Sequence, residues 1–161
     1  MATAIVEQIA QKLSARLAGI RTSAGYENTV SEVVRGTRFE GFRPQHLQLV
    51  INQGTLTRND ELSVPGNPPA TCWDVPFEIV GLLMPLESDS NKIDRLRNQF
   101  AADTIKAICT PASSWHNWDT LAILSTISEV SDVNSEESSG FRLTLTVTFR
   151  VTENNPFTGR S

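Results

Sequence analysis

Cysteine and histidine, which supply many metal and catalytic sites, are scarce in this sequence of 161 residues. It has two cysteines, Cys72 and Cys109, and two histidines, His46 and His116. Their spacing fits no zinc signature, so we expect no metal site. The cysteines lie far apart in apolar surroundings and are predicted to be core thiols. The sequence leaves open whether they approach each other.

Long apolar runs are also missing. No stretch approaches the roughly 20 residues that cross a bilayer. The first residues lack a basic region followed by a continuous apolar core, so no secretory signal is predicted. We therefore expect a soluble protein made in a reducing cytoplasm, with no membrane partner.

Clusters of positive charge do not occur. The 14 basic residues are outnumbered by 18 acidic ones, giving a net charge of −4, and the basic residues come singly or in spaced pairs. This charge balance disfavours a protein that binds nucleic acid through its phosphates. It is compatible with a protein that surrounds DNA without binding it.

Catalytic and nucleotide-binding motifs are absent. No glycine-rich loop ends in Gly-Lys-Ser/Thr, and no GxGxxG follows a strand, so no cofactor is predicted. Ser113 and Ser114 lie near His116, but no nucleophile elbow accompanies them. Carboxylates such as Asp89 and Asp94 fall where turns and helix starts explain them. We expect no enzyme.

What the sequence does contain is a nearly faultless alternation over residues 141–152. The apolar positions are Phe141, Leu143, Leu145, Val147, Phe149 and Val151. Alternation with period two predicts a strand with one buried face. The breaker cluster Glu-Asn-Asn-Pro-Phe ends it, and residues 153–161 are predicted to form an extended tail.

Along the rest of the chain the predicted order is a helix, several strands, a second helix and a further strand. Helices are predicted over 3–20 and 92–109, and strands over 29–35, 46–52, 72–84 and 120–130, with a turn over 132–140. The pattern predicts one α+β domain over residues 1–161. Its antiparallel or mixed sheet has about four to five strands, with two main helices packed on one face.

A long loop is predicted over residues 54–71, which contain three prolines and two glycines. Its apolar residues Leu56, Leu62 and Val64 would be wasted on solvent in a monomer. One interpretation is an arm that folds onto a neighbouring subunit. The alternative is a simple connector.

Trp115 and Trp118 fall in a second polar loop, together with His116. They fit either core anchors or interface anchors. A third interpretation makes this loop the site of a small hydrolase or ligand-binding domain, which requires a concave pocket with a perturbed titratable group.

The order of elements, together with several short sequence motifs, resembles the tail terminator family of long-tailed bacteriophages and related neck proteins. The matching parts are the opening amphipathic helix, the strand over 72–83 with its tryptophan, the helix around residues 100–105, and the closing Val-Thr-Phe-Arg and Asn-Pro-Phe phrases. The family more often has tyrosine where Phe149 and Phe157 stand.

The resemblance implies a non-enzymatic virion protein that forms a ring, usually of six subunits, at the head-proximal end of the tail tube. Such a ring ends tube polymerisation and docks the head connector, while DNA passes through its lumen without specific binding. Its partners are copies of itself, the tail tube protein and the connector. The alternative within this family is another neck protein of the same fold.

A closed ring needs two different complementary patches on every subunit. The candidate residues for contacts between subunits, or with the tube and connector, are Leu56, Arg58, Leu62, Val64, Trp115, Trp118, Arg150, Asn155, Pro156 and Phe157. The exposed side of the last strand fits either such a contact or an ordinary solvated face.

Overall fold

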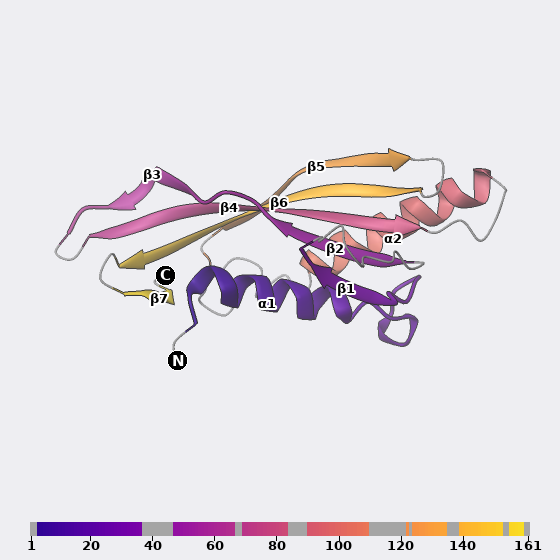
Figure 1. Cartoon of the computed structure of the whole chain (residues 1–161), viewed down its shortest axis with the longest axis horizontal. Helices are drawn as coiled ribbons and strands as arrows, with labels where there is room; N and C mark the ends of the chain where they lie inside the picture. Colours follow the sequence, from indigo (N-terminus) through magenta and orange to yellow (C-terminus); the bar gives the residue numbers. More distant parts are fainter. Residues whose placement is uncertain are drawn as a thin grey trace.

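The computed structural model describes residues 3–36, 47–66, 69–83, 90–109, 122, 124–134, 139–152 and 155–159. Within them, two α-helices lie against one face of a mixed sheet (Figure 1). The elements in chain order are α1 (Ile5–Ala18), the 3₁₀ turn η1 (Thr22–Ala24), β1 (Glu32–Arg35), β2 (Gln48–Gln53), β3 (Thr57–Val64), β4 (Ala70–Leu83), α2 (Ser90–Cys109), β5 (Leu124–Asn134), β6 (Ser139–Thr152) and β7 (Asn155–Gly159).

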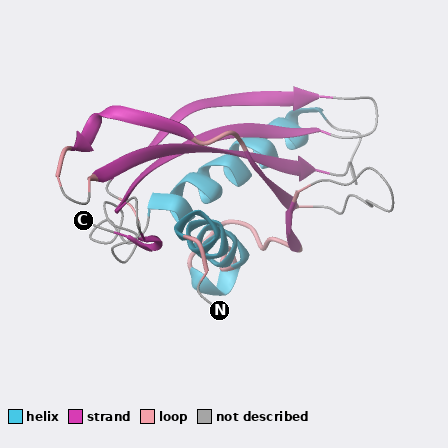
Figure 2. Ribbon diagram, turned by 60° about the vertical axis from the view of Figure 1, so that its left-hand side comes forward, coloured by secondary structure: helices cyan, strands magenta, loops and turns pink. Residues whose placement is uncertain are grey.

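The predicted α+β class is confirmed. The main path of the sheet runs β1-β2-β4-β6-β5, which fits the expected number of strands, and β3 and β7 join β4 and β6 to make seven. β1 pairs with β2 in parallel, and the other pairs are antiparallel. Figure 2 shows both helices on the same side of the sheet, as predicted.

β4 and β6 form the centre of the sheet because both alternate apolar and polar residues. In their register, Val75 faces Val147, Phe77 faces Leu145 and Ile79 faces Leu143. All six side chains are fully buried beneath the helices. The residues between them point to the opposite face, which neither of the two described helices covers.

Both helices bury an apolar stripe against this layer. In α1 the buried residues recur every four positions, namely Ile5, Ile9, Leu13 and Leu17. In α2 the ring of Phe100 packs edge-on against Phe141 of β6, with centroids 5.3 Å apart and an interplanar angle of 84°. Neither helix in the described part of the chain is long and apolar enough to cross a membrane.

The prediction of a loop over residues 54–71 is wrong for much of its length, because β3 occupies Thr57–Val64 and pairs with β4, which itself begins at Ala70. Pro65 and Pro69 follow the last residue of this strand, so they do not interrupt it, and Pro68 lies outside the described residues. The sequence did not predict β3 as a strand because its residues do not alternate between apolar and polar.

Two other boundaries differ from expectation. Part of the predicted tail, residues 155–159, is the strand β7, which pairs with the end of β6. β5 continues to Asn134, within the segment 132–140 predicted as a turn. The polar end of β5 pairs with the start of β6, so backbone hydrogen bonds hold residues that lack an apolar pattern.

The two cysteines are both free thiols. Cys72 is fully buried, which confirms that it is a core thiol, whereas Cys109 is half-buried. Burial raises the pKa of the Cys109 thiol above its ordinary value.

A two-point ion pair joins α1 to β1 and predicts a pH dependence. The Arg35 guanidinium donates to both carboxylate oxygens of Glu7, at 2.7 and 2.9 Å. These hydrogen bonds from Arg35 hold the pKa of Glu7 below its ordinary value of 4.5. Because the folded pKa is the lower one, the pair stabilises the fold above pH 4.5, and this contribution is lost as the pH falls through the folded pKa.

We expect Glu7→Gln to lower the free energy of unfolding at neutral pH by about 0.5 kcal/mol, since exposed pairs contribute little. The two side chains are 40% and 36% exposed. The difference from wild type should shrink progressively below pH 4.5. Urea titrations at a series of pH values measure it, and a difference that stays constant into acid would contradict the assignment.

Candidate functional site

The hairpin made by β3 and the start of β4, residues 57–74, is here called the arm. It extends past the ends of both helices, at the left of Figure 1. Thr57 pairs with Asp74, Arg58 with Trp73 and Asn59 with Cys72, and pairing resumes only at Val64 and Ala70. Backbone pairing thus holds the two ends of β3 and leaves its middle to other contacts.

The interruption is a large bulge, in which residues 60–63 of β3 lie opposite the single residue Thr71. Asn59 shapes this bulge with its own polar groups. Its side-chain oxygen accepts the backbone N–H of Leu62 at 3.2 Å, and its carbonyl accepts the hydroxyl of Ser63 at 2.7 Å. Asparagine and serine are the residues that make such local side-chain turns.

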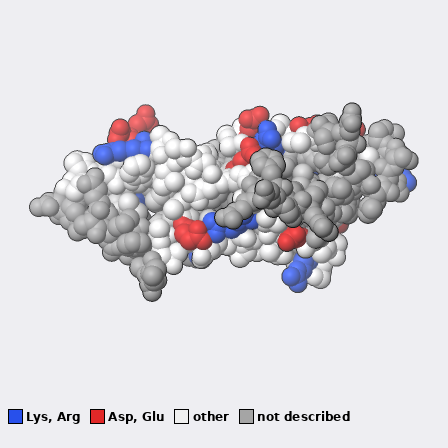
Figure 3. Space-filling model, viewed as in Figure 1, with Lys and Arg blue, Asp and Glu red and all other residues white. Residues whose placement is uncertain are grey.

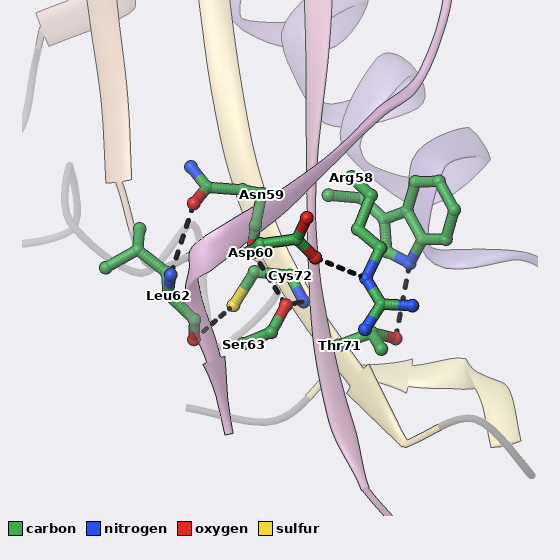
Figure 4. Close-up of polar contacts among 8 residues, drawn as sticks. Arg58, Asn59, Asp60, Leu62, Ser63, Thr71 and Cys72 are labelled. Carbon is green, nitrogen blue, oxygen red and sulfur yellow. Dashed lines mark hydrogen bonds and ion pairs between the residues drawn. The ribbon is translucent and has the colours of Figure 1, made fainter. Parts of the chain in front are cut away.

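Cys72 joins the bulge to β4 (Figure 4). Its backbone N–H donates to the Ser63 hydroxyl at 3.0 Å, and its thiol donates to the Leu62 carbonyl at 3.0 Å. Arg150 of β6 reaches across β4 to the same place. Its Nη2 donates to the Leu62 carbonyl at 3.1 Å and its Nε donates to the Cys72 sulfur at 3.3 Å.

A second polar contact fixes the base of the arm on the same face of the sheet. The carboxylate of Asp74 accepts Asn59 Nδ2 at 3.1 Å and the Thr148 hydroxyl at 2.5 Å. Asn59, Asp74 and Thr148 belong to β3, β4 and β6, so this carboxylate connects three strands. The arm is therefore a well-anchored element.

The arm and the segment just before it carry most of the exposed apolar side chains of the described residues. Among the described residues, the large apolar side chains that count as exposed are Leu56 (36%), Leu62 (37%), Val64 (47%) and, on β5, Val130 (46%). Three of the four lie on β3 or just before it. A projecting strand that carries exposed apolar side chains is a candidate contact surface.

A hollow of about 340 Å³ lies on the arm beside Val64. It is lined by Arg58, Asp60, Ser63, Val64, Pro65, Pro69, Ala70 and Thr71. Arg58 and Asp60 form an exposed ion pair of 2.7 Å beside it, visible in Figure 4. The hollow is thus of mixed character: apolar residues line part of it, and hydroxyl groups and one balanced pair of charges line the rest.

Charged side chains are sparse on the described part of the face shown in Figure 3. In Figure 3 the charged side chains of the described residues form small groups of both signs, with uncharged surface between them. A surface of this kind offers no broad electrostatic field to attract nucleic acid. It suits contacts made by shape and apolar burial.

A second hollow, of about 530 Å³, lies where β1, β2 and β4 meet, and it is lined by Arg35, Gly36, Ile51, Asn52, Gln53 and Phe77. The guanidinium of Arg35 is already held by Glu7. Within the described ranges, no three histidine, cysteine, aspartate or glutamate side chains gather as metal ligands would.

No family model matches the chain, and no curated protein matches its sequence. Function therefore has to be inferred from the surfaces of the molecule, since one fold hosts many functions.

The structure brings together half of the residues predicted for contacts. Leu56, Arg58, Leu62 and Val64 lie on or beside β3, and Arg150 reaches the same strand from β6. The backbone of residues 155–157 belongs to β7, on the side of β6 away from the arm, and their side chains lie outside the described residues. Trp115 and Trp118 also lie outside the described residues.

Sequence reasoning missed the residues that hold the arm in place, namely Asn59, Ser63, Cys72, Asp74 and Thr148. The Asn59 and Ser63 pair carried a signal, because such residues close local turns. Asp74 and Thr148 carried none, since they meet across 74 positions of sequence.

Proposed function

We propose that this protein is a structural subunit of a phage virion. It forms a ring with copies of itself at the head-proximal end of the tail tube, ends tube growth there and docks the head connector. The observation that carries this proposal is the arm: a strand fixed by hydrogen bonds that projects past the helices and exposes Leu62 and Val64. Such a strand is suited to binding another protein surface.

The second surface of the ring contact is proposed to lie on β5. A ring closed by rotation joins two different patches of neighbouring subunits. Val130, the exposed apolar side chain away from the arm, is on β5, which ends at the opposite end of the sheet in Figure 1. An arm and a receptor surface at opposite ends allow each subunit to bind the next one in the same way.

The charge of the chain suits the proposed position of the ring. A lumen through which DNA passes has to avoid holding phosphates, and a subunit with a net charge of −4 favours passage over binding. The tail tube protein and the connector are the other proposed partners, bound on the two open faces of the ring.

We expect the double substitution Leu62→Asp and Val64→Asp to abolish ring assembly. Burying two added carboxylates in an apolar contact is unfavourable by several kcal/mol, so we expect assembly to weaken by about a hundredfold or more. Because both side chains are exposed in the subunit, its urea unfolding midpoint should hardly change. Light scattering after size exclusion and negative-stain images of the protein with tail tubes measure assembly.

The matched control is Asn98→Asp with Ala102→Asp, which places the same two charges on the exposed side of α2. This variant should assemble like wild type. If the arm variant also assembles like wild type, the arm is not the contact surface. A wild-type protein that stays monomeric at high concentration and ignores tail tubes would refute the proposed function.

A further inference from the structure

The middle of β3 depends on side chains for its position. Between Asn59 and Val64 the register with β4 is broken, so residues 60–63 lack the regular ladder that holds the rest of the sheet. Among the described residues, Cys72 and Arg150 supply hydrogen bonds that reach this bulge from outside β3. Those bonds decide where the bulge lies over the sheet.

Arg150 acts from two strands away. It pairs with Cys72 in the β4–β6 register, and Cys72 in turn pairs with Asn59 of β3. From there one guanidinium holds two atoms, the Leu62 carbonyl oxygen and the Cys72 sulfur. A planar guanidinium does this with fixed geometry, whereas a lysine ammonium acts as a single flexible point.

We propose that Arg150 is a positioning residue for assembly, which holds the arm in the conformation that a second copy of the chain binds. This inference rests on the proposed function and changes the role first expected for Arg150, which was direct contact with a partner. By fixing the carbonyl of Leu62, Arg150 sets the direction of the exposed Leu62 side chain. A preformed arm loses less conformational entropy when it binds.

The thiol of Cys72 reports directly on the position of the bulge. It is fully buried and donates to the Leu62 carbonyl, so a maleimide reaches it only when the bulge lifts from β4. In a Cys109→Ser background, Cys72 is the sole thiol. We expect Arg150→Lys to speed its labelling by about tenfold, because a single ammonium cannot hold both the Leu62 carbonyl and the Cys72 sulfur in place.

Arg150→Lys keeps a long aliphatic side chain at this position, so we expect faster labelling to reflect movement of the bulge. Amide exchange of the peptide around Leu62 and Ser63 gives a second reading and should rise with it. The control is Arg142→Ala, which removes an arginine from the same strand, where it pairs with Glu78. This control should leave both readings unchanged.

Ring assembly tests whether a second copy of the chain binds the arm in the conformation that Arg150 holds. At equal urea unfolding midpoints, we expect Arg150→Lys to weaken ring formation about tenfold and Arg142→Ala to leave it unaltered. Unchanged labelling and exchange would overturn the role of Arg150 in holding the arm. Faster labelling with normal assembly would overturn its role in docking. A wild-type chain that never assembles would refute the proposed function, while the labelling result would still decide the role of Arg150 in the arm.

Discussion

Replacing Phe100 with alanine is expected to lower the free energy of unfolding by about 4 kcal/mol, the middle of the range for a buried phenylalanine. Phe100 is among the largest fully buried side chains and joins α2 to β6 through its edge-on contact with Phe141. The substitution removes the ring and leaves a cavity beneath the sheet. Urea unfolding followed by circular dichroism measures the loss.

The matched control for Phe100→Ala is Asn98→Ala, which lies on the same helix with an exposed side chain. It should change stability by less than about 0.5 kcal/mol. If Phe100→Ala proved equally mild, α2 would not be packed on the sheet as described. Thr104, also on α2, should not be used as a control because it is fully buried.

Replacing Asp103 with alanine is expected to lower the free energy of unfolding by about 3 kcal/mol, since it strands buried donors. The carboxylate of Asp103 is 4% exposed and accepts three hydrogen bonds from the segment after α1. The donors are the backbone N–H of Glu27 at 3.2 Å and the backbone and side-chain N–H groups of Asn28, both at 2.9 Å. Without Asp103, the two Asn28 donors stay buried with no acceptor.

Asp103→Asn should be nearly as damaging. Both carboxylate oxygens of Asp103 accept hydrogen bonds, and the amide nitrogen that replaces one of them cannot accept. Asp94→Ala is the control: it removes a carboxylate from the same helix, one that is 59% exposed and paired with Arg97. Its expected effect is below about 1 kcal/mol. Equal effects at positions 94 and 103 would contradict the buried network.

The central part of the fold was predictable because apolar periodicity determines it. The alternation in 141–152 and 72–84 identified the strands β6 and β4, and the four-residue recurrence in 3–20 identified α1. Each of these patterns exists because one face of the element is buried. Where neither face is apolar, as in β3, the sequence carries no periodic signal.

The site was predictable only in part, for the same reason. The exposure of Leu56, Leu62 and Val64 follows from their placement in a polar segment, and the structure confirms it. That this segment is a strand with a bulge depends on Asn59, Ser63 and Arg150, which act through single hydrogen bonds. The bond from Arg150 to Leu62 spans 88 positions, and no local pattern encodes such a distance.

The long pairing of β4 with β6 also bears on the order of events during synthesis. β4 ends at Leu83, but its partner along its whole length lies between Ser139 and Thr152. The central ladder therefore cannot close until the ribosome has made Thr152, long after β4 itself. Arg150, which holds the arm, is also absent until then, so under the proposed function a nascent chain has no preformed arm with which to bind a neighbour.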